Sequence, residues 1–152
     1  MKIIFLDIDG VLNTHHSMTR GRTSECLHHF QKSCVRELNR LIRLSGAKIV
    51  VSSTWRKGKR WPQVIQHIKT EGVIGQVIDR TGVSDDRIRG HEIAEWLEMP
   101  NHPEVESFVI LDDDSDMDLL MDRLVLTSMN GGLRRHHVDS ALEILERRAH
   151  DP

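Results

Sequence analysis

Short apolar runs alternate along the chain with stretches in which apolar residues recur at helical spacing. The runs cover residues 3–6, 47–51, 73–78, 107–111 and 124–126. Each run contains at most one polar residue, which is typical of strands in a parallel sheet with both faces covered. They predict five strands, with the strand at 73–78 near an edge of the sheet.

Helices are predicted between these strands, over residues 34–44, 62–71, 91–97, 117–121 and 138–148. Ser33 is a candidate N-cap of the first helix, and Gly46 is placed to end it. Because strands alternate with helices, the sequence predicts an α/β fold. Its expected form is a three-layer, doubly wound, mostly parallel sheet with right-handed crossovers.

The 152 residues are predicted to form a single domain, 1–152. Residues 13–33 are mostly polar and lack periodicity, so we expect a loop or flap over the carboxyl end of the first strand. No N-terminal targeting segment is expected before that strand, and no apolar run is long enough to span a membrane. Two cysteines, Cys26 and Cys34, predict a cytoplasmic protein with free thiols.

Composition narrows the functional classes. A net charge of −2 gives no overall signature of nucleic-acid binding. The lack of tyrosine and an aromatic content of 4% argue against a stacking platform for single strands. Ten histidines are present, but without the spacing of a zinc site. The oligomeric state is left open.

Two of the predicted strands end in acidic residues. The first runs into Asp7-Ile8-Asp9-Gly10, and the fourth runs into Asp112 and Asp113. In an extended backbone residues i and i+2 face the same side, and parallel strands present ligands at their carboxyl ends. Clustered carboxylates are costly unless a cation lies between them or one of them takes a proton, and Mg²⁺ favours oxygen ligands. A solvated turn would explain one such ending, but two favour a metal site.

The segment from Asp7 to Asn13 resembles motif I of the haloacid dehalogenase (HAD) superfamily, most of whose members are Mg²⁺-dependent phosphohydrolases. The wider pattern resembles the HAD domains found alone or within nucleic-acid repair proteins, and it covers nearly the whole chain. Its further segments are residues 50–56, residues 89–93 with Trp96-Leu97, and residues 110–113.

This resemblance implies roles for the motif I residues. Asp7 would be the nucleophile that forms an aspartyl-phosphate, and it would also bind the metal ion. Asp9 would protonate the leaving alcohol and then deprotonate the attacking water, with its backbone carbonyl as a further metal ligand. The second aspartate is absent from the dehalogenase branch, so its presence favours phosphoryl transfer.

Motif II of the resemblance begins at Ser52, whose hydroxyl would hold a phosphate oxygen; Ser53 is the alternative. Ser53 and Thr54 would add backbone N–H groups. Trp55 would either line the site or pack against the sheet, and Arg56 is a candidate phosphate clamp.

Motifs III and IV supply a cation and two acids. Arg89, at the start of a predicted helix, matches the family's cation and can bind phosphate through its forked guanidinium; Arg87 and Lys57 compete for this role. Asp113 is favoured as the direct metal ligand over its neighbour Asp112, although the acidic run could also be a solvated helix start.

The spacing of the motifs bears on the substrate. Neither the 45 residues from Asp7 to Ser52 nor the 37 from Ser52 to Arg89 have room for a large cap domain. By family analogy an open site suits the phosphorylated end of a bulky substrate. Basic residues near the expected site mouth favour a polyanion, and Trp61 could stack on a base or lead into a helix. The basic residues are Arg20, Arg22, Arg56, Lys57, Lys59 and Arg60.

The sequence therefore predicts a Mg²⁺-dependent phosphomonoesterase, with a nucleic-acid end or a nucleotide as the candidate substrate. A phosphotransferase that uses the same intermediate is an alternative. A non-catalytic Mg²⁺-binding module is a second alternative, which the presence of every acidic motif residue disfavours.

Overall fold

A computed structural model of the chain describes residues 1–21, 27–57 and 60–151. At its centre is a five-stranded sheet in which all neighbouring strands run parallel, in the order β3-β2-β1-β4-β5. The strands are β1 (Lys2–Leu6), β2 (Lys48–Val51), β3 (Val77–Arg80), β4 (Ser107–Asp112) and β5 (Leu124–Leu126).

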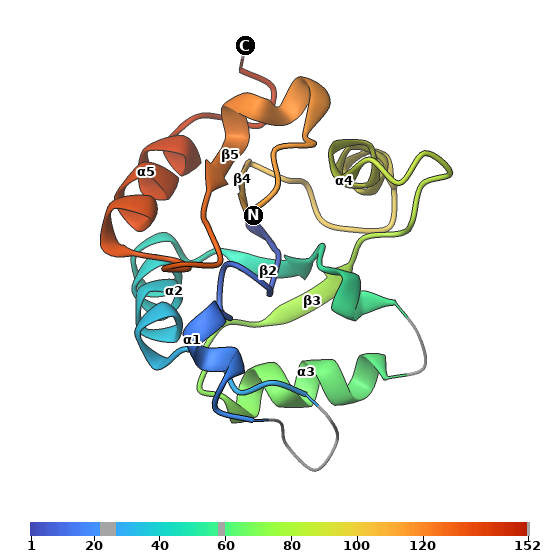
Figure 1. Cartoon of the computed structure of the whole chain (residues 1–152). Helices are drawn as coiled ribbons and strands as arrows, with labels where there is room; N and C mark the ends of the chain where they lie inside the picture. The colour runs from blue at the N-terminus through green and yellow to red at the C-terminus, as the bar shows by residue number, and fades with distance from the viewer. Residues whose placement is uncertain (22–26, 58–59, 152) are drawn as a thin grey trace.

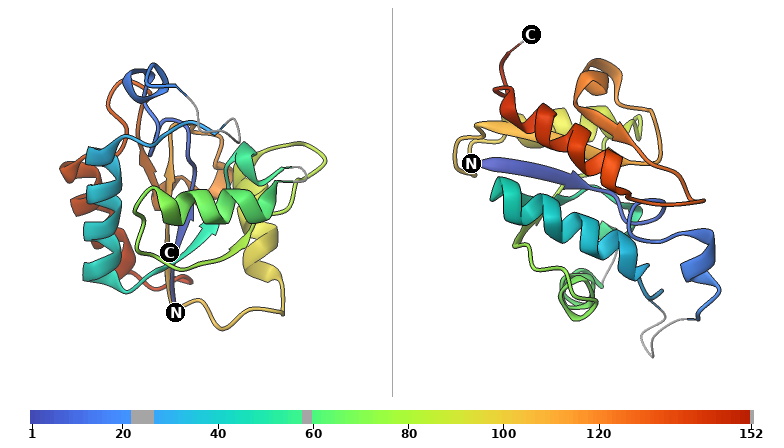
Figure 2. Two further views of the ribbon diagram at one scale, coloured as in Figure 1. Left: turned by 90° about the horizontal axis from the view of Figure 1, so that it is seen from below. Right: turned by 90° about the vertical axis from the view of Figure 1, so that its left-hand side faces the viewer.

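Helices cover both faces of this sheet, which gives three layers (Figure 1). On one face lie α2 (Lys32–Ser45), α3 (Trp61–Thr70) and α5 (Arg135–Glu146), with α2 and α5 side by side (Figure 2). On the other face lie α4 (Arg89–Glu98) and the 3-10 helix η2 (Asp118–Arg123). A short helix α1 (His15–Met18) follows β1, and a 3-10 turn η1 (Thr54–Arg56) follows β2. The predicted α/β architecture is confirmed.

The central strand β1 shows why a continuous apolar run is needed here. Ile4 and Leu6 face the layer of α2, α3 and α5, whereas Ile3 and Phe5 face α4. All four side chains are fully buried, and each burial stabilises the fold by about 1.5–3 kcal/mol. The Phe5 ring also packs edge-on against Trp96, with ring centroids 5.4 Å apart.

Two local predictions about elements are wrong. The strand predicted at 73–78 is β3 at Val77–Arg80, although it does lie at the sheet edge. Its polar residues join the sheet because Asp79 accepts a hydrogen bond from Trp96 Nε1 (2.8 Å) and Arg80 donates one to Arg56 O (2.7 Å). Ser33 lies inside α2, which begins after Gln31 without a side-chain cap. Gly46 ends α2 in the predicted left-handed conformation, at φ 68°.

The excursion predicted at 13–33 is held together at its base. Gln31 N donates to Leu12 O (2.8 Å), and Phe30 N donates to Glu71 Oε1 at the end of α3 (2.7 Å). Thr14 caps α1. Within the described parts of this excursion and of the β2–α3 connection, α1 and η1 are the elements present, which confirms the absence of a large cap.

Cys34 is a buried free thiol, and Cys26 lies outside the described residues. In residues 1–21, 27–57 and 60–151, no helix has the length and apolar character needed to cross a membrane.

Candidate active site

The candidate site lies at the carboxyl edge of the sheet, between β1 and β4. The ladder extends one residue past β1 and β2, since Asp7 N donates to Leu111 O (3.0 Å) and Ser52 N to Leu6 O (2.9 Å). The chain leaves β1 towards α2 on one face and enters β4 from α4 on the other, so β1 and β4 flank a topological switch point. Open α/β sheets bind ligands at such points.

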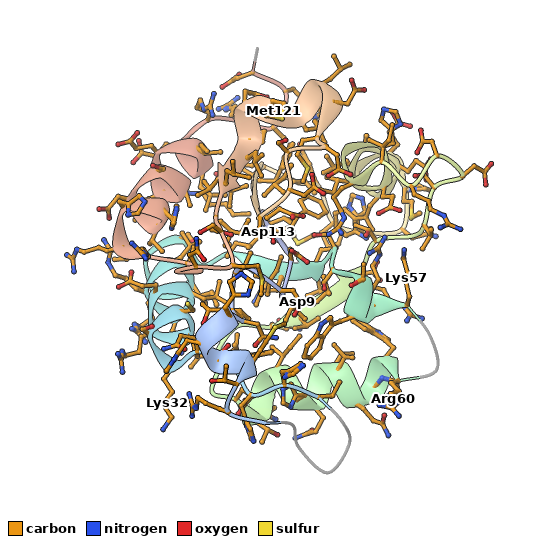
Figure 3. The ribbon with its side chains drawn as sticks, in the orientation of Figure 1. Asp9, Lys32, Lys57, Arg60, Asp113 and Met121 are labelled. Atoms are coloured by element: carbon orange, nitrogen blue, oxygen red, sulfur yellow. The ribbon has the colours of Figure 1, made fainter. Side chains whose placement is uncertain are left out.

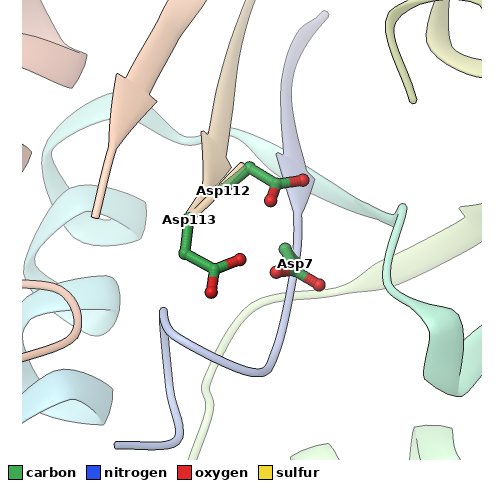
Figure 4. Close-up of side chains that lie close together, drawn as sticks. All are labelled: Asp7, Asp112 and Asp113. Atoms are coloured by element: carbon green, nitrogen blue, oxygen red, sulfur yellow. The ribbon is translucent and has the colours of Figure 1, made fainter. Parts of the chain in front are cut away.

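Three carboxylates converge there. Asp7 follows β1, Asp112 ends β4 and Asp113 comes next; their side chains point toward one another (Figure 4). Each offers an oxygen within 4.8 Å of the other two. Burial together with the charge of Asp112 raises the pKa of Asp7 to about 8, and burial raises the pKa of Asp112 to about 6. A hard divalent cation bound by oxygen ligands would relieve this repulsion, so the donor set fits Mg²⁺.

The turn after β1 has no space for a side chain at Gly10. The φ of Gly10 is 83°, and a Cβ on this residue would lie 2.4 Å from Asp113 Oδ2. Glycine adopts this conformation without strain. The close approach of Gly10 thus keeps Asp113 directed at Asp7.

Arg89 supplies a cation to the cluster from the first residue of α4. Its Nη1 donates to Asp112 Oδ2 (3.1 Å) and lies 3.7 Å from Asp7 Oδ1. The alternatives Arg87 and Lys57 are both exposed. The structure therefore brings Arg89, of the three candidates, into contact with the carboxylates.

The start of α4 is fixed against the loop after β4. Arg89 N donates to Asp116 Oδ2 (3.1 Å) and Gly90 N to Asp116 O (3.0 Å). A Cβ on Gly90 would lie 2.1 Å from Met117 O, so only glycine allows this approach. Gly90 was not singled out in the sequence, because its partner lies 27 residues away.

The two serines after β2 differ in their contacts. Ser52 is fully buried, and its Oγ has no hydrogen-bond partner among the described residues. Ser53 Oγ accepts from Trp55 N (3.2 Å) and caps η1. The buried hydroxyl of Ser52 thus has unused hydrogen-bonding capacity, whereas that of Ser53 already accepts one hydrogen bond. Thr54 is exposed.

Arg56 is built into the interior and does not face a ligand. Its Nε and Nη groups donate to the carbonyls of Ser52, Ser53, Thr81 and Gly82, and to Glu92 Oε2 at 2.5 Å. These five bonds occupy all five N–H donors of the guanidinium. The predicted phosphate clamp is thus a brace that ties the end of β2 to α4. Glu92, which the sequence did not single out, also lies 3.8 Å from Arg89 Nε.

Asp9 lies apart from the carboxylate cluster. The strand ends at Leu6, before both aspartates of the turn, and Asp113 is the third carboxylate of the group. Asp9 Oδ1 accepts from Asn13 Nδ2 (3.0 Å), and Oδ2 accepts from Trp55 Nε1 (3.1 Å).

The predicted basic rim is only partly described. Arg20, Lys57 and Arg60 are exposed, and Figure 3 shows Lys57 and Arg60 on the side where η1 and α3 lie. Arg22 and Lys59 lie outside the described residues. Trp61 begins α3, and the Arg80 guanidinium lies 5.0 Å from its ring centroid.

Together, the doubly wound parallel sheet, the carboxylates at its switch point and the helix-borne arginine define a domain of HAD type, the phosphatase and phosphotransferase class. Residues 3–138 match the family model described as the HAD domain in Swiss Army Knife RNA repair proteins. The chain belongs to this family. A search of curated proteins found no match to the chain.

Proposed function

We propose that this domain is a Mg²⁺-dependent phosphomonoesterase that acts through an aspartyl-phosphate on Asp7. The observation that carries the proposal is the grouping of Asp7 with Asp112 and Asp113 within 4.8 Å, with Arg89 beside them. A structural ion pair would need only one of these carboxylates. Three carboxylates beside one arginine at the edge of the sheet leave an excess of negative charge, which suits a metal ion that in turn binds a phosphoryl group.

In the first step, a carboxylate oxygen of Asp7 attacks phosphorus. The bond from phosphorus to the ester oxygen breaks, and Asp9 gives its proton to the departing oxygen, so the alcohol leaves neutral. Arg89 balances negative charge beside the nucleophile, and the Ser52 hydroxyl donates to a non-bridging oxygen.

In the second step, water attacks the phosphorus of the aspartyl-phosphate. Asp9 takes the proton of this water, the bond between phosphorus and Asp7 breaks, and inorganic phosphate leaves with the Asp7 carboxylate restored. Asp9 thus ends the cycle protonated, as it began.

Mg²⁺ would be held by Asp7 and Asp113, with Asp112 beside them, and by the Asp9 carbonyl that the family resemblance implies. When bound, it neutralises charge on the phosphoryl oxygens. Asp113 is the better direct ligand, because both oxygens of Asp112 already accept hydrogen bonds, from Arg89 Nη1 and Asp114 N.

The family description and the lack of a large cap support a phosphorylated RNA end as the substrate. The exposed side chains of Lys57 and Arg60 at the η1–α3 side would face the phosphates of such a strand.

The test is phosphate release from p-nitrophenyl phosphate with Mg²⁺, with EDTA, and by Asp7→Asn. The same samples are then given RNA and DNA oligonucleotides that carry a 3′- or a 5′-phosphate. We expect Mg²⁺-dependent release that Asp7→Asn abolishes, with a preference for RNA. Release that continues in EDTA or in Asp7→Asn would contradict the proposal. Transfer of phosphate to an added alcohol in place of water would identify a phosphotransferase.

A further inference from the structure

The Asp9 side chain is fixed by two donors from different segments. Asn13 Nδ2 bonds one oxygen at 3.0 Å, and the indole N–H of Trp55 bonds the other at 3.1 Å. Asn13 belongs to the turn after β1, where Asp9 and Asn13 also form a backbone bridge, and Trp55 belongs to η1 after β2. The direction of the carboxylate is therefore set by both contacts together.

Trp55 packs in a cluster with two other rings. Its centroid lies 5.9 Å from that of Phe30, on the return of the excursion after β1, and 5.9 Å from that of His67 on α3. Phe30 and His67 pack edge-on at 5.0 Å. Glu71 Oε1 accepts from Phe30 N (2.7 Å), which anchors this return segment to α3. Ring packing thus fixes the indole with its N–H toward Asp9.

The Trp55 indole bonds an acid in the turn that also carries Asp7, whereas the same kind of bond at Trp96 involves Asp79 on the edge strand. The rings of Phe30 and His67 account for the packing of Trp55, but neither accounts for an indole N–H directed at an acid next to the active-site turn. Because general acid catalysis depends on placement within hydrogen-bond reach of the leaving oxygen, the two donors decide whether Asp9 can act.

We propose that Trp55 and Asn13 are positioning residues that hold Asp9 in line with the leaving group, and that Phe30 and His67 hold Trp55. The excursion after β1 thereby contributes to catalysis through the ring that it packs on Trp55. This inference rests on the proposed function, because it needs Asp9 to act as an acid.

The variant Trp55→Phe keeps a ring in the cluster and removes the N–H. Trp96→Phe is the matched control, because Trp96 also donates its indole N–H to a carboxylate, that of Asp79 at 2.8 Å, on the far side of the sheet. Both variants lose one indole–carboxylate hydrogen bond, and only one of these bonds involves Asp9.

The readout is kcat/KM with two substrates that differ in leaving group. The sugar hydroxyl of a ribonucleoside monophosphate needs a proton to leave, whereas p-nitrophenol leaves as a stable anion. We expect Trp55→Phe to lower kcat/KM at least about tenfold for the nucleotide and by less than about threefold for p-nitrophenyl phosphate, as for partial loss of a general acid. Trp96→Phe should change both values by the same factor.

Asn13→Ser is the second variant and carries the test if Trp55→Phe does not fold, with the same difference between substrates expected. Equal losses on the two substrates, or a Trp55→Phe that behaves as Trp96→Phe does, would overturn the inference while the proposed function stands. A wild-type protein that hydrolyses neither substrate with Mg²⁺ would overturn the proposed function and this inference with it.

Discussion

Arg56 and Glu92 form a 2.5 Å ion pair in the interior, with side chains only 2% and 3% exposed. The pair joins the segment after β2 to α4, the helix that carries Arg89. Burial lowers the pKa of the Arg56 guanidinium, and the Glu92 charge opposes this effect. The stability of the fold and the geometry of the site therefore depend on the same contact.

Arg56→Met should leave Glu92 buried without its closest countercharge, with only Arg89 Nε, at 3.8 Å, remaining among the described residues. We expect the free energy of unfolding to fall by about 3–5 kcal/mol, because a buried carboxylate without its partner loses both solvation and pairing. Urea denaturation measures this change. Arg40→Met is the control: Arg40 pairs with Asp139, which is 54% exposed, so its loss should be much smaller. Equal losses of unfolding free energy in the two variants would contradict the bracing role of Arg56.

Gly10→Ala should impair Mg²⁺ binding. The left-handed conformation costs an alanine about 1–2 kcal/mol, and its methyl group would displace Asp113. Gly46→Ala has a similar backbone strain, at φ 68°, but its added methyl group would have no atom within 4 Å. Calorimetric titration with Mg²⁺ should show weakened binding only for Gly10→Ala. If both variants bind Mg²⁺ as the wild type does, Asp113 is not a ligand.

Ser52→Ala should affect catalysis, whereas Ser53→Ala should affect stability. Removing the Ser52 hydroxyl, which has no partner among the described residues, should leave thermal stability unchanged and lower kcat about a hundredfold. Removing the Ser53 hydroxyl uncaps η1, so it should lower stability by about 1 kcal/mol. Thermal unfolding and phosphatase assays on the two proteins measure both effects. A stable, fully active Ser52→Ala would rule out this serine as a phosphate contact.

His91 should make stability depend on pH. Its ring nitrogens bond Asp86 (2.5 Å) and Asp118 (2.8 Å), and these bonds raise the pKa of His91 above its ordinary value. Hydrogen bonds, the first from Ile88 N, lower the pKa of Asp86 to about 2, so Asp86 stays ionised.

Because the folded pKa of His91 is raised, its contribution is complete below the unfolded value near 6.5 and is lost as pH rises through the folded value. His91→Asn should therefore lower the unfolding midpoint at about pH 5.5 and change it little at about pH 9. A difference that is constant with pH would exclude protonation as the cause.

How far the sequence specifies the fold depends on the element. The predominantly apolar runs place β1, β2 and β4 to within about a residue, because burial on both faces admits few polar side chains. At β3 this signal fails, since Asp79 and Arg80 enter the strand through bonds to residues on other segments.

The sequence likewise predicts one part of the site and not another. Asp7, Asp112 and Asp113 can be placed together because each lies at the carboxyl end of a strand, and parallel strands end at one edge. The bracing role of Arg56 cannot be predicted, because its partners at Thr81, Gly82 and Glu92 are 25 to 36 residues away. The placement of Asp9 likewise depends on Trp55, a contact across 46 residues.

The proposed function depends on transfer of the phosphoryl group to Asp7. It is tested most directly by acid-quenched mass spectrometry of the protein during turnover of p-nitrophenyl phosphate with Mg²⁺, in the wild type and in Asp9→Asn. We expect a phosphate on the peptide that contains Asp7, with more of it in Asp9→Asn, where the second step lacks its base. No phosphate on that peptide in either protein, together with turnover that survives Asp7→Asn, would contradict it.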